Sequence, residues 1–272
     1  MVCPIVYPYP FSCCVGPVGL GDGVGQTNIS LAKRLADAAG RILSPDRAVQ
    51  AVDATFIPVS RPRGLVGFLP LTRDGDCSVH RPCSPALHQT HTTLNVTVAG
   101  NVRLLTWYYF VSIHLGTFEP SSLDMYPPPE ILTFLMRESR WQHCANGSQP
   151  AETCLQAVDI AQAQGQLPDL SSGSSRLGSE GQDAWRLFQL SPRITVGEGS
   201  WTVLGEPTMV VPVSRQRFVS MTVTATCVGW TLHADTDYGD ADGLALVTPA
   251  NVYVNVLFQH TCQARVCRYC VS

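Results

Sequence analysis

The sequence predicts an all-β protein built as an antiparallel sandwich or barrel. Apolar and polar residues alternate in several runs, most clearly in residues 93–98 and 103–115. Only a half-buried strand needs a period of two. About eight to ten strand-like runs follow one another without helices between them, which favours an antiparallel sheet over a parallel one.

The composition indicates a surface that neighbouring molecules cover. Of the 272 residues, 45% are hydrophobic and 14% are charged, against a usual charged share of about 25%. Lys33 is the one lysine among 18 basic residues. Arginine suits interfaces better than lysine, although a GC-rich genome explains the bias equally well. The net charge of -3 and the absence of runs of like charge argue against a protein that coats nucleic acid.

The 11 cysteines are interpreted as mostly free thiols in a reducing compartment. Residues 1–16 lack the positive start of a signal peptide, and no apolar run reaches the length of a membrane span. The glycosylation sequons at Asn28, Asn95 and Asn146 are then unused. Their presence keeps a second hypothesis open, a secreted or surface β-sandwich glycoprotein that binds a protein partner.

The first 43 residues predict an arm and a short helix. Residues 1–25 are rich in Pro, Gly and Cys and lack periodicity, as in an extended arm. Residues 27–43 fit a helix that places Leu31, Leu35 and Ile42 on one face and ends at Ser44-Pro45.

The β pattern begins at residue 48, and residues 60–90 are loop-like. Residues 93–98 place Leu94, Val96 and Val98 on one face. Residues 103–115 place Trp107 and Tyr109 on one face and Tyr108 and Phe110 on the other, which favours core packing plus one interface over a base-stacking surface.

The rest of the chain predicts further strands, divided by one short helix and one exposed loop. The helix is placed at 151–166 and the loop at 168–184. Strands are expected at 131–137, 185–190, 193–196, 201–204, 208–213, 219–230 and 252–258. In the run 219–230, Met221, Val223, Ala225 and Cys227 lie opposite Thr222, Thr224 and Thr226.

Several segments resemble the end of a picornavirus major capsid protein. They are Glu206–Ser214, Cys227–Trp230, Tyr238-Gly239, Gly243–Val247, Asn251–Phe258 and the basic stretch His260–Arg268. Gly19–Asp22 and Arg47–Asp53 resemble the start of the outermost of the three major capsid proteins.

This resemblance implies an eight-stranded antiparallel jelly-roll β-sandwich with a short N-terminal helix and extended terminal arms. The chain would divide into an arm with the helix (1–47), a jelly-roll domain (48–258) and a tail (259–272). It implies a structural, non-enzymatic virion protein that assembles in the host cytoplasm with other capsid proteins. The shell encloses a positive-strand RNA genome with little direct RNA contact, and the outermost subunit often carries host receptor-binding loops.

No catalytic or cofactor-binding residue is predicted. The sequence lacks a Gly-x-Ser-x-Gly elbow. Cys77 and His80 lie close together in a Pro-rich loop without an orienting third group. The glycines of Gly19–Gly25 fail the dinucleotide-binding spacing.

No metal site is predicted, although two candidates exist. His260, Cys262, Cys267 and Cys270 have zinc-ligand spacing but need a second half, such as His88 with His91 or Cys77 with Cys83. Free thiols at a subunit contact are favoured instead. The four carboxylates of Asp235–Gly243 could bind calcium, but an Asp- and Gly-rich turn is favoured.

Overall fold

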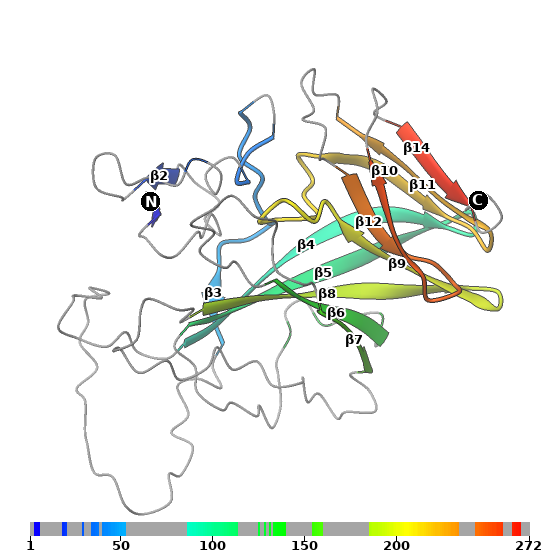
Figure 1. Cartoon of the computed structure of the whole chain (residues 1–272), viewed down its shortest axis with the longest axis horizontal. Helices are drawn as coiled ribbons and strands as arrows, with labels where there is room; N and C mark the ends of the chain where they lie inside the picture. The colour runs from blue at the N-terminus through cyan, green and yellow to red at the C-terminus, as the bar shows by residue number, and fades with distance from the viewer. Residues whose placement is uncertain are drawn as a thin grey trace, which may run out of the picture.

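The computed structural model of the chain describes residues 3–5, 18–20, 29, 34–37, 40–52, 86–113, 125, 128, 131, 133–139, 154–159, 185–233, 243–257 and 263–267. These residues form a mostly β protein, which confirms the predicted all-β class (Figure 1). Within them, no helix is long and apolar enough to cross a membrane.

A single curled sheet of twelve strands carries most of the described chain. Its path runs β13-β12-β9-β8-β5-β4-β10-β11-β14, with β3 beside β4, β6 beside β8 and β7 beside β6. The strands are β3 (Gln50–Ala51), β4 (Ala86–Val98), β5 (Asn101–Ile113), β6 (Thr133–Ser139), β7 (Cys154–Asp159), β8 (Trp185–Val196), β9 (Gly199–Gly205), β10 (Phe218–Val223), β11 (Cys227–Leu232), β12 (Gly243–Val247), β13 (Tyr253–Leu257) and β14 (Gln263–Cys267). A separate parallel pair joins β1 (Cys3–Ile5) to β2 (Val18–Leu20).

The sheet curls because its long strands change partners along their length. β8 pairs with β5 and β6 in its first part and with β9 from Arg193 onward. β4 pairs with β5 throughout and adds β10 at its last three residues, in parallel. The two edge strands β13 and β14 are joined by the short step from Leu257 to Gln263, which spans at most about 20 Å. The edges of the sheet therefore lie near each other.

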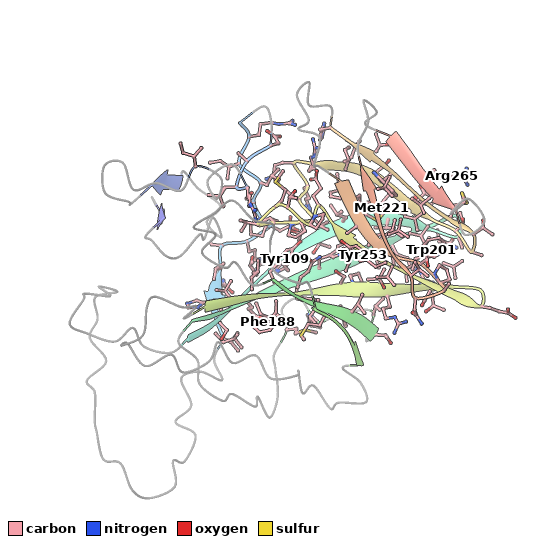
Figure 2. The ribbon with its side chains drawn as sticks, in the orientation of Figure 1. Tyr109, Phe188, Trp201, Met221, Tyr253 and Arg265 are labelled. Carbon is pink, nitrogen blue, oxygen red and sulfur yellow. A yellow bond between two sulfur atoms is a disulfide. The ribbon has the colours of Figure 1, made fainter. Side chains whose placement is uncertain are left out.

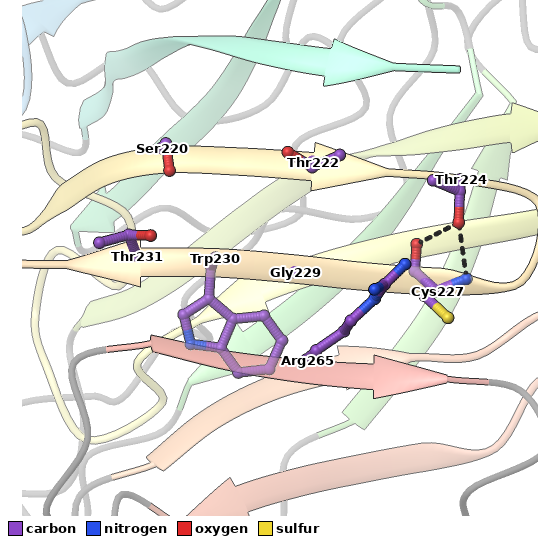
Figure 3. Close-up of a pocket in the computed structure, with 8 residues that line it drawn as sticks. All are labelled: Ser220, Thr222, Thr224, Cys227, Gly229, Trp230, Thr231 and Arg265. Carbon is purple, nitrogen blue, oxygen red and sulfur yellow. Dashed lines mark hydrogen bonds between the residues drawn. The ribbon is translucent and has the colours of Figure 1, made fainter. Parts of the chain in front are cut away.

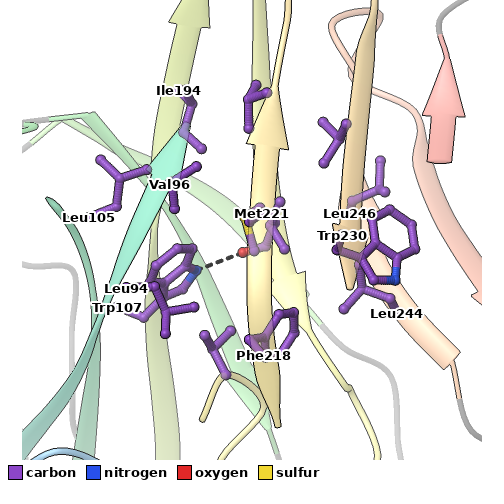
Figure 4. Close-up of a cluster of buried hydrophobic side chains, with 14 of the residues drawn as sticks. Leu94, Val96, Leu105, Trp107, Ile194, Phe218, Met221, Trp230, Leu244 and Leu246 are labelled. Carbon is purple, nitrogen blue, oxygen red and sulfur yellow. Dashed lines mark hydrogen bonds between the residues drawn. The ribbon is translucent and has the colours of Figure 1, made fainter. Parts of the chain in front are cut away.

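The main core fills the inside of this curl. Its buried side chains come largely from β4, β5 and β8 to β12, and Trp107 is among those fully enclosed (Figure 4). Trp201 is fully enclosed as well. The indole N–H of Trp107 donates to the Val203 carbonyl at 2.8 Å and so links β5 to β9. Each large apolar side chain buried here contributes about 1.5–3 kcal/mol.

A second core lies on the opposite face of β5, β6 and β8. It includes Tyr108, Phe110, Phe134 and Phe188, and the Tyr108 and Phe134 rings meet edge to face. The alternation predicted for residues 107–110 is confirmed. Both faces are buried within this chain, so this stretch forms two cores and not a core and an interface.

The helix predicted for 27–43 is wrong where the structure describes it. Residues 34–37 and 40–43 pair with each other instead: Ala36 bridges Ile42, and the Leu43 N–H bonds to the Leu35 carbonyl at 2.8 Å. The Asp37 carboxylate accepts the backbone N–H that follows Gly40, and Gly40 takes a positive φ of 77°. Asp and Gly favour turns for these reasons, and of the described residues Ile29 alone is helical.

The strand predicted for 219–230 is two strands joined by a turn. β10 ends at Val223 and β11 begins at Cys227. The Thr224 hydroxyl accepts the Cys227 N–H at 2.9 Å, and the Thr224 N–H bonds to the Cys227 carbonyl at 2.8 Å. A threonine side chain that satisfies the backbone in this way replaces ladder bonds, so the alternation stops there.

Three other sequence predictions are corrected. Residues 208–213 form turns and bends and not a strand. The Pro212 carbonyl folds back to accept the Glu206 N–H at 2.8 Å. Gly205 (φ 89°) allows this close approach, because a Cβ there would collide with the Pro212 carbonyl. Residues 154–159 form β7 and not a helix. β4 begins at Ala86, inside the loop predicted for 60–90.

Candidate functional site

Several described side chains on the distal half of one sheet face are exposed, and we call this half the outer face. It consists of the side chains of β5, β4, β10, β11 and β14 that point away from the main core. Near β8 the same face of β5 is covered by the second core. The register aligns one row across all five strands: Val102, Thr97, Thr222, Gly229 and Arg265.

Three aliphatic side chains lie exposed on or beside this face. Val102 is 70%, Leu104 is 49% and Val219 is 54% exposed. The side chains between them are small and polar, and include Asn95, Thr97, Ser220 and Thr222. Burying such a surface avoids most of the large cost of desolvating charges, and its hydroxyls can be buried if a partner supplies hydrogen bonds to them.

An open groove of about 500 Å³ crosses the outer face over β10, β11 and β14 (Figure 3). Gly229 lies between Thr222 and Arg265 and has no side chain, which lowers the floor of the groove. The hydroxyl of Thr224 is already engaged, since it donates to the Cys227 carbonyl at 3.0 Å. The groove is lined by Ser220, Thr222, Thr224, Cys227, Gly229, Trp230, Thr231 and Arg265.

Four tight turns gather at the end of the sheet beside this face (Figure 1). They join β4 to β5, β8 to β9, β10 to β11, and β12 to β13. The Ala99 N–H donates to the Val223 carbonyl at 2.9 Å, and a Cβ on Gly199 would lie 2.9 Å from Pro249. Glu198 is the one charged residue within these four turns, so this end can approach another molecule closely.

A disulfide closes one corner of the outer face. Cys227 and Cys267 are directly opposite in the β11–β14 pairing, with their Cα atoms 4.0 Å apart, and their sulfur atoms are bonded. The prediction of free thiols is therefore wrong for this pair. The bond also removes Cys267 from the zinc set considered above, whose other members His260, Cys262 and Cys270 lie outside the described residues.

His88 and His91 do not form half a metal site. They are three residues apart on β4, so they point to opposite faces of the sheet. Burial lowers the pKa of both, and for His91 the carboxylate of Asp46 acts in the opposite direction. Within the part of the chain that the structure describes, no three His, Cys, Asp or Glu side chains are grouped to hold a metal ion.

The remaining sequence candidates fall mostly outside the described residues. These are Cys77 with His80 and Cys83, the acidic segment 235–242, glycines 21–25, and the sequons at Asn28 and Asn146. Asn95 is described and exposed on the outer face. Sequence reasoning noted the Thr stripe of β10 but missed the outer face itself, because only the register between strands assembles the five short stripes into one surface.

Comparisons of the chain with protein-family models, with curated proteins and with solved structures found no match.

Proposed function

We propose that this chain is a structural shell subunit, a jelly-roll capsid protein of a small icosahedral positive-strand RNA virus. The observation that carries the proposal is the outer face, where Val102, Leu104 and Val219 are exposed among small polar side chains. Arg215 and Arg265 lie beside these residues. Exposed aliphatic patches on an ordered sheet are typical of surfaces that bind other proteins. No enzymatic role is included.

The resemblance noted in the sequence supports the proposal. Three of its segments fall on strands that follow one another along the chain: Cys227–Trp230 on β11, Gly243–Val247 on β12, and Asn251–Phe258 largely on β13. A sheet that curls until its two walls pack across one core is compatible with the jelly roll. The division into eight strands in two facing sheets belongs to the proposal.

Assembly would draw on simple forces at the outer face. Burying the aliphatic side chains against a neighbour yields about 25 cal/mol per Å². The hydroxyls of Ser220 and Thr222 supply hydrogen bonds, and the exposed guanidinium of Arg265 can bond a carboxylate in two places. The partners are other capsid proteins in a homo- and hetero-oligomeric shell that encloses RNA, with a host receptor as an outside partner.

The test is sedimentation velocity of the purified chain and of the variant V102K/L104K. The wild-type chain should sediment as oligomers or aggregates, and the variant should shift to monomer because two buried ammonium groups oppose the contact. Ile42, an exposed aliphatic residue away from the outer face, provides the control I42K, which should behave as wild type. A variant as oligomeric as wild type, with unchanged circular dichroism, would contradict the proposal.

A second candidate function is a secreted or surface β-sandwich glycoprotein that binds a protein partner. Two observations favour it: the Cys227–Cys267 disulfide, because disulfides persist in oxidising compartments, and the exposure of Asn95 within its sequon. Peptide mass spectrometry of the natural protein separates the two. A glycan on Asn95 in a monomeric chain supports the second candidate, whereas an unmodified Asn95 in a large particle supports the first.

A further inference from the structure

The edge strand β14 is held by few non-covalent contacts. In the described chain it pairs with β11 alone, over residues 263–267. Val266 is its described inward side chain, and it packs at the margin of the main core while Arg265 points outward and is exposed. A short edge strand of this kind opens more easily than the central strands, which are held on both sides.

The disulfide clamps one end of this strand pair. It joins the first residue of β11 to the last residue of β14, 40 positions apart. The five residues 258–262 connect β14 to β13, which lies at the other edge of the sheet path. The covalent bond is thus the strongest single link between β14 and the sheet wall that it extends.

We propose that β14 is an exchangeable strand and that the Cys227–Cys267 disulfide is its redox-operated lock. A dithiol reductant transfers two electrons and two protons to the two sulfur atoms and leaves as its own cyclic disulfide. Both cysteines become thiols, and β14 can leave the edge of β11. The released strand then pairs with β11 of a second copy.

A second copy is the partner because the fit is already present in this chain. Every copy offers the same β11 edge, with Gly229 opposite Arg265 and Cys227 opposite Cys267. Exchange of an identical element keeps all of these pairs and only changes which copy supplies the strand. Short hinge connections favour exchange of this kind, and only five residues, 258–262, separate β13 from β14 in the sequence.

The test mixes equal amounts of unlabelled and ¹⁵N-labelled chain, reduces the mixture with dithiothreitol and reoxidises it with oxidised glutathione. Mass spectrometry then follows the peptide pair joined through Cys227 and Cys267. We expect up to about half of these pairs to join one labelled to one unlabelled peptide, as random exchange between copies requires. Without reduction, both peptides of a pair should carry the same label.

Two variants make the test specific. In V266P the residue on β14 opposite Val228 loses an N–H that faces β11 in the antiparallel ladder, so the mixed pairs should fall sharply.

In C267S the lock is absent, so the amides of 263–266 should exchange with deuterium equally fast with and without reductant. In the wild-type chain these amides should exchange faster only after reduction.

Same-label pairs alone after the full redox cycle would overturn the proposal, as would equally slow amide exchange of β14 before and after reduction. Exchange requires only this chain and its own second copy. Its failure therefore leaves the shell function standing, and the loss of the shell function leaves strand exchange standing.

Discussion

At the scale of single residues, the most unusual group is a buried ion pair. The Arg217 Nε lies 3.0 and 3.1 Å from the two carboxylate oxygens of Glu206, and both side chains are almost fully buried. The Arg217 Nη1 also donates to the His233 carbonyl at 3.0 Å. The pair ties the loop after β9 to the start of β10 and the end of β11.

Substituting Arg217 by methionine should destabilise the fold by about 3–5 kcal/mol, because it removes the buried guanidinium that bonds to the buried Glu206 carboxylate. Urea unfolding measures this change. R215M is the matched control, since Arg215 pairs with Asp46 while both side chains are partly exposed and such pairs contribute about 0–1 kcal/mol. Equal losses for R217M and R215M would mean that burial does not set the strength of the pair.

The buried histidines predict a pH-dependent stability. Desolvation lowers the pKa of His88 and His91 in the folded chain below the ordinary value of 6.5. Between the folded-state and unfolded-state pKa values of each histidine, the unfolded chain binds more protons than the folded chain. The free energy of unfolding is therefore unaffected by these histidines above about pH 6.5 and decreases as the pH falls below that value. Unfolding midpoints in urea across this range give the slope.

H88Q/H91Q removes both titrating rings, and its stability should depend less steeply on pH just below 6.5. His233 lies exposed at the end of β11, so H233Q controls for the exchange of a histidine for a glutamine. A slope that H88Q/H91Q leaves unchanged assigns the pH dependence to other groups.

At the scale of elements, two buried tryptophans allow the contribution of a hydrogen bond to stability to be measured apart from that of packing. Trp107 and Trp230 are both buried in the main core. Trp107 bonds to the Val203 carbonyl, whereas the Trp230 Nε1 has no hydrogen-bond partner among the described residues. We expect W107F to cost about 1–3 kcal/mol more than W230F, because it leaves a buried carbonyl without its donor. Chemical denaturation of both variants tests this difference.

The alternation of apolar and polar residues predicted the strands best in the long runs that became β4 and β5. Leu94, Val96 and Val98 share the main core as expected, and the residues around Trp107 divide between two faces. Side-chain period is local information, and it survives in long strands such as β4 and β5. The outward Thr stripe of β10 was also visible in the sequence.

Predictions from the local sequence pattern were wrong where a side chain forms hydrogen bonds with nearby backbone groups and so creates a turn. The 27–43 run has helical spacing, but Asp37 and Gly40 form a turn that places Leu35 and Leu43 in the interior and leaves Ile42 partly exposed. Thr224 likewise ends β10 within an alternating run. Strand pairing over long separations, such as β4 with β10 or β11 with β14, leaves no local trace, so the disulfide and the outer face could not be foreseen.

At the scale of the whole molecule, the described part of the curled sheet has one broad face and one end with few charged side chains. The outer face presents Val102, Leu104 and Val219, and the four gathered turns present one carboxylate, that of Glu198. Side chains distributed over the described strands fill the interior of the curl (Figure 2). The low charged fraction of the sequence thus coincides with two surfaces that can bind neighbouring molecules, as the proposed shell subunit requires.

The most direct measurement is sedimentation of the source material, with negative-stain imaging and peptide mass spectrometry of the fast fraction. If the chain is a shell subunit, the fast fraction should hold spherical particles that contain this chain, similar-sized partner subunits and RNA. A chain that remains at the top of the gradient as a glycosylated, disulfide-bonded monomer would contradict this role.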